Sequence, residues 1–200
     1  MNRNRTLLII GLFAVLLIGL TTCGINSIPT AEENAKAKWA DVQNYYQRRA
    51  DLVPNLVATV RAAAAQERTV LREVTEARAS ASRITVTGEQ LTDPAAMARF
   101  AEAQSRLTIS LQRLQEAYPE LRTNQNFLEL QSQIEGTENR IATARRDYND
   151  AVRDYNVTIR TFPTIMAARV IYGAQPMAPY AADAAAQSAP SVADAFGNGQ

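Results

Sequence analysis

The stretch WADVQNYYQRRADLVPNLVATV, Trp39 to Val60, decides the fold of this chain. Its apolar and aromatic side chains recur at alternating steps of three and four residues, the spacing that keeps them on one face of an α-helix. The same spacing continues from position 39 to position 81, where eleven of thirteen positions are apolar or aromatic. A strand could not use it, because strand side chains alternate every second residue. The pattern predicts one helix from residue 31 to about Arg83, with Thr30 and Glu33 as a capping box at its start.

Two further helices show the same spacing. The second has Asp93 as its N-cap and ends before Pro119, because proline cannot continue a helix. The third begins after Thr123 or Asn124 and ends at Pro163. A short fourth helix is predicted over residues 164–172, with the following glycine as its C-cap.

The pair Tyr-Asn occurs twice in the third helix, at Tyr148–Asn149 and Tyr155–Asn156. The two tyrosines fall on the apolar stripe seven residues apart, so they are predicted to be buried side chains of that stripe. Gly136 interrupts the same helix and indicates a close approach of a neighbouring helix.

Long amphipathic helices joined by short loops pack antiparallel to bury their stripes. The sequence therefore predicts an all-α, up-and-down bundle of three long helices and a short fourth over residues 31–172. The second helix is too short to cover the first, so part of that stripe needs the fourth helix, a second copy or another protein. Residues 173–200 are rich in alanine and proline, lack Lys and Arg, and are predicted to be disordered.

The N-terminal segment, residues 1–25, has the pattern of a membrane-targeting sequence. Two arginines precede fourteen uninterrupted apolar or glycine residues, Leu7 to Leu20. This is typical of a signal anchor that leaves the N-terminus in the cytoplasm and the bundle outside. The alternative is a lipoprotein signal acylated at Cys23, although Thr22 stands where a small residue usually precedes that cysteine. Plain secretion is a third reading.

The composition excludes several kinds of chemistry. The chain has no histidine, a single cysteine and a net charge of +1. It therefore lacks the residues of His-dependent hydrolases and of the common zinc and di-iron sites, and it contains no Gly-rich phosphate loop. We expect no enzymatic activity, cofactor or metal, although a hydrolase that works through two facing carboxylates stays open. The interleaved acidic and basic residues of the third helix argue against nucleic acid binding.

One candidate site stands out in the first helix. Pro54 removes a backbone donor and bends the helix, and the polar residues Arg48, Arg49, Asp51 and Asn55 surround it. This bend is either a surface that binds a partner or a kink whose charges and freed carbonyl are satisfied inside the bundle. Glu138, Asn139 and Arg140 of the third helix are the expected internal partners.

Long stretches of the chain resemble one known family. The runs Trp39–Val60, Val74–Ala81, Tyr118–Asn156 and Phe162–Gly173 are similar to the LemA family of bacterial envelope proteins. The resemblance implies an N-terminal membrane anchor followed by an extracytoplasmic antiparallel four-helix bundle. It implies no enzymatic activity or cofactor.

These observations favour a membrane-tethered scaffold or protein-interaction module in the bacterial cell envelope. Its expected partners are the membrane, through residues 1–25, and envelope proteins; a homo-oligomer is a further expectation. The alternative is a module that binds cell-wall glycan or lipid in a groove along the first helix, and an open aromatic cleft near Tyr45 and Tyr46 would favour it.

Overall fold

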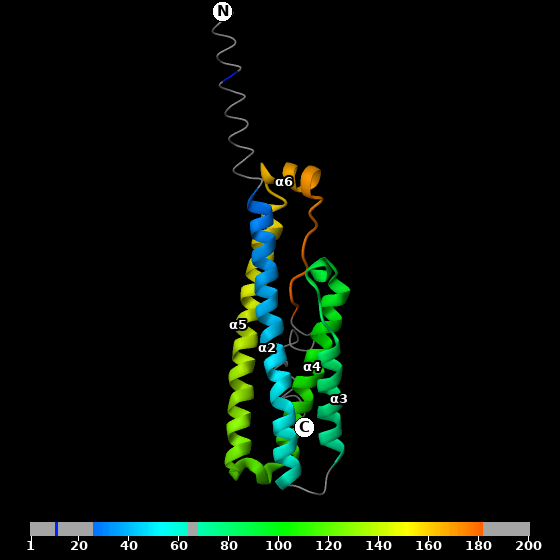
Figure 1. The fold of residues 1–200 in the computed structure, drawn as a ribbon, viewed down its shortest axis with the longest axis vertical. Helices are drawn as coiled ribbons and strands as arrows, with labels where there is room; N and C mark the ends of the chain where they lie inside the picture. Colours follow the sequence, from blue (N-terminus) through cyan, green and yellow to red (C-terminus); the bar gives the residue numbers. More distant parts are fainter. Residues whose placement is uncertain (1–10, 12–25, 64–67, 182–200) are drawn as a thin grey trace, which may run out of the picture.

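The computed structural model describes Gly11 and residues 26–63 and 68–181. In these ranges the chain is helical and contains no strand. The elements are α2 (Ser27–Ala63), α3 (Thr69–Arg83), η1 (Gly88–Thr92), α4 (Pro94–Ala117), η2 (Pro119–Thr123), α5 (Gln125–Thr158), α6 (Thr164–Ala167) and η3 (Ala168–Tyr172). Helices α2, α3, α4 and α5 alternate in direction along a rod, and α6 lies across one end (Figure 1). The antiparallel bundle is therefore confirmed.

The prediction of a single helix from residue 31 to Arg83 is wrong. Helix α2 ends at Ala63, and α3 begins at Thr69 and runs back along the rod, packed against α4 and α2 (Figure 1). The bundle thus has four long helices, and α3 supplies the cover that a longer first helix would have needed from elsewhere. The apolar spacing keeps its phase across the reversal, so periodicity alone could not reveal it.

The predicted helix ends are mostly correct. The Asp93 side chain accepts from the Ala95 amide at 2.8 Å, and the Asn124 side chain accepts from the Phe127 amide at 3.1 Å. The expected capping box at Thr30 is absent, because α2 starts at Ser27 and the Thr30 hydroxyl donates to the Asn26 carbonyl at 2.8 Å.

The interior consists of two apolar cores, one above the other. The aromatic core contains Trp39, Phe100 and Tyr148, with the Trp39 ring centroid 5.2 Å from Phe100 and 5.1 Å from Tyr148. The aliphatic core lies toward the other end of the rod and consists mostly of leucine and valine, such as Leu56 and Leu107, with Tyr118 and Phe127 among them. Tyr148 and Tyr155 are both buried in the aromatic core, as predicted. The prediction for Gly136 is wrong, because a Cβ added there would meet no atom within 4 Å.

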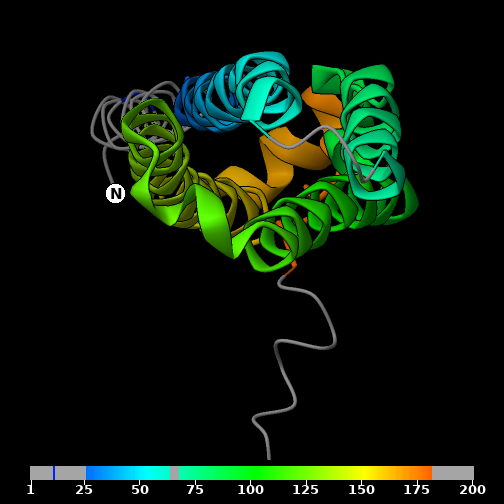
Figure 2. The same ribbon diagram turned by 90° about the horizontal axis from the view of Figure 1, so that it is seen from below.

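The C-terminal part of the chain also differs from the prediction. Gly173 adopts a φ of 56° and ends η3 as expected for a C-cap glycine. The chain then runs back into the bundle (Figure 2). Met177, Ala178 and Tyr180 are buried in the aromatic core. The expected disorder is therefore wrong for residues 174–181, and the rest of the predicted tail, 182–200, lies outside the described residues.

The predicted anchor, residues 1–25, lies outside the described residues apart from Gly11, and so does Cys23. Over residues 26–63 and 68–181, no helix combines the length and apolar character needed to cross a bilayer.

Candidate functional site

The residues of the predicted bend lie on two sides of α2. Arg49 points inward and is only 1% exposed, whereas Arg48, Asp51, Pro54 and Asn55 are on the outer surface. The spacing explains this division, because position 49 belongs to the buried stripe and the other four do not. Arg49 is therefore not available to a partner, and a partner-binding role for the four exposed residues stays a prediction.

Arg49 joins three helices through its two terminal nitrogens. One nitrogen donates to Glu138 Oε1 of α5 at 2.5 Å and to Thr108 Oγ1 of α4 at 2.7 Å. The other donates to the Gln104 side chain at 2.8 Å and to its backbone carbonyl at 3.0 Å. Glu138 was among the expected partners, but both α4 residues were missed, because nothing in the sequence links positions 49 and 104.

The four residues Arg49, Gln104, Thr108 and Glu138 form a polar layer between the aromatic and aliphatic cores. Along their helices Arg49, Gln104 and Glu138 each fall between members of the two cores, as Gln104 does between Phe100 and Leu107. A buried charge is costly unless it is paired and hydrogen-bonded. Within the described part of the chain, the Arg49 Nε is a buried donor without a partner, so the other bonds of Arg49 must offset that cost. The layer therefore favours one register of the helices, because sliding α4 or α5 along α2 would separate these groups.

The carbonyl freed by Pro54 is also satisfied inside the bundle. Proline at position 54 cannot donate to the Ala50 carbonyl, and the Arg78 Nε of α3 donates to that oxygen at 2.9 Å. The sequence interpretation expected α5 to fill this role. The partner comes from α3 instead, because the chain reverses after Ala63 and brings α3 alongside α2.

The asparagines of the two Tyr-Asn pairs hold the C-terminal segment. The Asn149 side chain accepts from the Tyr180 amide at 2.8 Å and donates to its carbonyl at 3.1 Å. Asn156 makes the same two bonds to Met177, each at 2.9 Å. Each amide side chain thus pairs with both backbone groups of one residue, as a neighbouring strand would.

Two tyrosine hydroxyls complete this clamp. Tyr148 donates to the Ala178 carbonyl at 2.8 Å, and the hydroxyls of Tyr46 and Tyr180 lie 2.8 Å apart. Burial raises the pKa of all three phenols above the ordinary value of a tyrosine. The Arg145 guanidinium carbon lies 4.2 Å from the Tyr180 ring centroid, a cation–π contact from the surface side. Met177 and Tyr180 were the only bulky side chains near the start of the predicted tail, and that was the signal that sequence reasoning missed.

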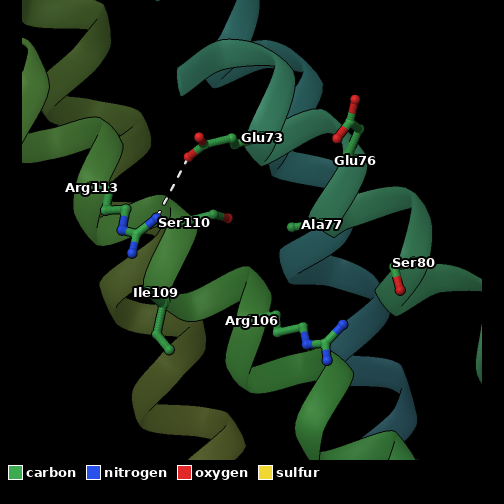
Figure 3. A pocket seen from close by; sticks show the side chains of 8 residues that line it. All are labelled: Glu73, Glu76, Ala77, Ser80, Arg106, Ile109, Ser110 and Arg113. Atoms are coloured by element: carbon green, nitrogen blue, oxygen red, sulfur yellow. Dashed lines mark ion pairs between the residues drawn. The ribbon is translucent and has the colours of Figure 1, made fainter. Parts of the chain in front are cut away.

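A groove of about 470 Å³ runs between α3 and α4 (Figure 3). Ala77 and Ile109 provide its apolar surface, and the Ile109 side chain is 48% exposed. Charges of both signs surround it, and Arg113 Nη1 lies 3.7 Å from Glu73 Oε2 across the groove. Its other lining residues are Glu76, Ser80, Arg106 and Ser110.

A second hollow, of about 280 Å³, lies beside α2 where α3 ends and α4 begins. The amide side chains of Gln43, Gln47 and Gln104 line it together with Tyr46 and Phe100. These two rings are only 5% and 3% exposed, so neither offers a free face on which a sugar could stack. Across residues 26–63 and 68–181, no three His, Cys, Asp or Glu side chains gather in a group that could hold a metal ion.

Together these features define a class of protein, an antiparallel helical bundle in which a buried arginine layer and a clamped C-terminal segment fix the arrangement of the helices. Residues 38–193 match the model of the LemA family, and the chain belongs to this family. The resemblance drawn from the sequence is thereby confirmed, and membership is consistent with a protein of the bacterial envelope. A comparison with curated proteins finds no match.

Proposed function

We propose that this protein is a non-enzymatic helical bundle, tethered to the bacterial membrane by residues 1–25, that binds another envelope protein. The observation that carries the proposal is the groove between α3 and α4 (Figure 3). Family membership and the apolar run Leu7–Leu20 support the envelope location and the tether.

The composition of the groove fits a protein partner. Ala77 and the exposed Ile109 supply apolar surface, and acidic and basic side chains lie beside them, as at many protein interfaces. The ridge of a partner helix fits between two adjacent helices, and its apolar side chains would meet Ile109 while its charges pair with Arg113 or Glu73. The Arg113 and Glu73 side chains are 65% and 44% exposed, so their ion pair contributes little to stability. It can therefore break at little cost when either side chain pairs with a charge of the partner.

Site-specific photocrosslinking in cells tests this proposal. A photoreactive residue at Ile109 and another at Ser80, both in the groove, should capture the same protein, identified by mass spectrometry. The same residue at Arg122, an exposed position in η2, is the matched control. Groove adducts that also form at Arg122, or different proteins captured at the two groove positions, would remove the basis for the proposal.

The tether has its own test, mass analysis of the mature N-terminus. An intact Met1 or Asn2 supports the signal anchor, with the bundle outside the cytoplasm. An acylated Cys23 supports the lipoprotein alternative.

The hollow beside α2 favours a second candidate function, binding of a cell-wall glycan or lipid. The amide side chains of Gln43 and Gln47 can hydrogen-bond to sugar hydroxyls, and the volume of about 280 Å³ suits one sugar ring better than an acyl chain. Titration of the full chain with cell-wall glycan fragments, compared with the Gln47→Ala variant, tests it. Binding that survives in Gln47→Ala would place the ligand elsewhere.

A further inference from the structure

Exposed apolar side chains concentrate at one end of the rod. Of the eight large apolar side chains that are exposed in the described residues, five lie between positions 162 and 172. We call these five the apolar cap: Phe162 (84% exposed), Met166 (61%), Val170 (79%), Ile171 (61%) and Tyr172 (42%). Single exposed apolar residues are common on protein surfaces, but a contiguous cluster of this kind marks a surface that meets a partner or a membrane.

The fold holds the cap with its apolar side chains outward. Ala168, in the middle of the segment, is 1% exposed and packs into the aromatic core. The Ala174 amide donates to the Ala168 carbonyl at 2.9 Å, and the clamped residues 177–180 follow directly. On the other side, the Thr164 hydroxyl donates to the carbonyl of Thr158, the last residue of α5, and to the Thr161 carbonyl. The segment is thus fixed at both ends, and its large side chains have no place in the core.

The chain segment that includes the cap carries charges of one sign. Residues 159–181 contain two arginines, Arg160 and Arg169, both exposed, and no acidic residue. The first acidic residues of α2, Glu32 and Glu33, are both paired with Lys36, at 2.8 and 2.9 Å. Apolar side chains beside basic ones are the combination that binds the surface of an anionic bilayer.

The cap lies at the end of the rod where α2 begins (Figure 1). Only six residues separate Leu20, the last residue of the apolar run, from Ser27, the first residue of α2. Six residues span at most about 20 Å even when fully extended. If the apolar run lies in the membrane, this end of the bundle is held near the bilayer surface.

We propose that the apolar cap inserts into the membrane interface, with its large side chains at the boundary of headgroups and acyl chains and with Arg160 and Arg169 at anionic headgroups. This inference rests on the membrane tether of the proposed function. The cap gives the rod a second contact with the bilayer, which sets the bundle upright on the membrane instead of leaving it free to swing.

Lipid photolabelling of the full chain tests the proposal. The protein is reconstituted into vesicles of phosphatidylethanolamine and phosphatidylglycerol that contain a lipid with a diazirine in its acyl chain, and labelled tryptic peptides are quantified. Peptide 161–169 carries part of the cap, and peptide 123–140, at the far end of α5, carries the exposed Leu128 as a control. We expect about tenfold more label in the first peptide, from burial of apolar surface in lipid.

Two double variants sharpen the test. Val170→Asp with Ile171→Asp should lower the label in peptide 161–169, whereas Ile109→Asp with Leu128→Asp, at exposed positions elsewhere, should not. Circular dichroism checks that both variants keep their helix content.

Flotation of the vesicles separates the two proposals. A chain that floats with the vesicles but carries equal label in both peptides overturns the cap and leaves the tether intact. A chain that does not float overturns the tether and the cap with it. Oxidative dityrosine crosslinks between Tyr172 of two copies, without lipid label, would assign the surface to a dimer and overturn the membrane contact.

Discussion

Replacement of Arg49 by methionine tests whether the polar layer holds the bundle together. Methionine keeps most of the side-chain volume but removes four hydrogen bonds, to Thr108, Glu138 and both oxygens of Gln104. Loss of one member of a buried ion pair typically costs about 3 to 5 kcal/mol. Here the Glu138 side chain is 35% exposed and can regain water, which reduces the cost. The buried Gln104 oxygen cannot do so. We therefore expect a loss of about 2 to 3 kcal/mol.

The measurement is urea unfolding of the full chain in detergent, followed by the fluorescence of Trp39. This residue is the only tryptophan of the chain and is 2% exposed in the aromatic core. The matched control is Arg48→Met, which removes the neighbouring, exposed arginine and should change stability by less than about 0.5 kcal/mol. Arg49→Lys should fall between the two, because lysine keeps the charge but cannot reach Glu138 and Gln104 together.

The result that refutes this reasoning is equal stability of Arg49→Met and Arg48→Met. If Arg49→Met keeps its stability but loses a crosslinked partner, the polar layer is a binding site and the interpretation as an internal joint is wrong. A fall in thermal midpoint of about 5 to 10 °C, the shift expected for 2 to 3 kcal/mol in a chain of this size, supports the joint.

Three further predictions concern the clamp and the bend. The double variant Asn149→Ala with Asn156→Ala removes four hydrogen bonds to the C-terminal segment, so hydrogen exchange at the Met177 and Tyr180 amides should accelerate. Asn139→Ala, at an exposed position, should leave this exchange unchanged. An unaltered exchange rate in the double variant would contradict the clamp. Burial raises the pKa of Tyr148, so the folded state holds its proton more tightly than the unfolded chain. The free energy of unfolding should therefore fall as pH rises above about 10, with a smaller slope in Tyr148→Phe, and equal slopes would contradict this. Arg78→Met should lower the free energy of unfolding by about 1 to 2 kcal/mol in the native sequence. The loss should be smaller when Pro54→Ala is also present, because the alanine at position 54 supplies a backbone amide for the Ala50 carbonyl. An equal loss in both backgrounds would show that Arg78 does not replace that donor.

The sequence alone determined the local features of the fold. Apolar residues that recur every three or four positions identified the helical class and the burial of Tyr148, because this spacing places them on the buried face of a helix. The caps at Asp93 and Asn124 were readable for the same reason, since each side chain bonds to a backbone group only two or three residues away.

Only the tertiary structure decided what each buried face packs against. The stripe is the same whether the chain continues after Ala63 or turns back, so the reversal that produces α3 left no trace in the periodicity. The partners of Arg49 lie 55 to 89 residues away, and Tyr180 reaches a hydroxyl 134 residues distant. The composition of residues 174–181 indicated disorder because it has little apolar surface of its own. The segment is ordered because Asn149 and Asn156, on the same face of α5, hydrogen-bond to the backbone of Tyr180 and Met177.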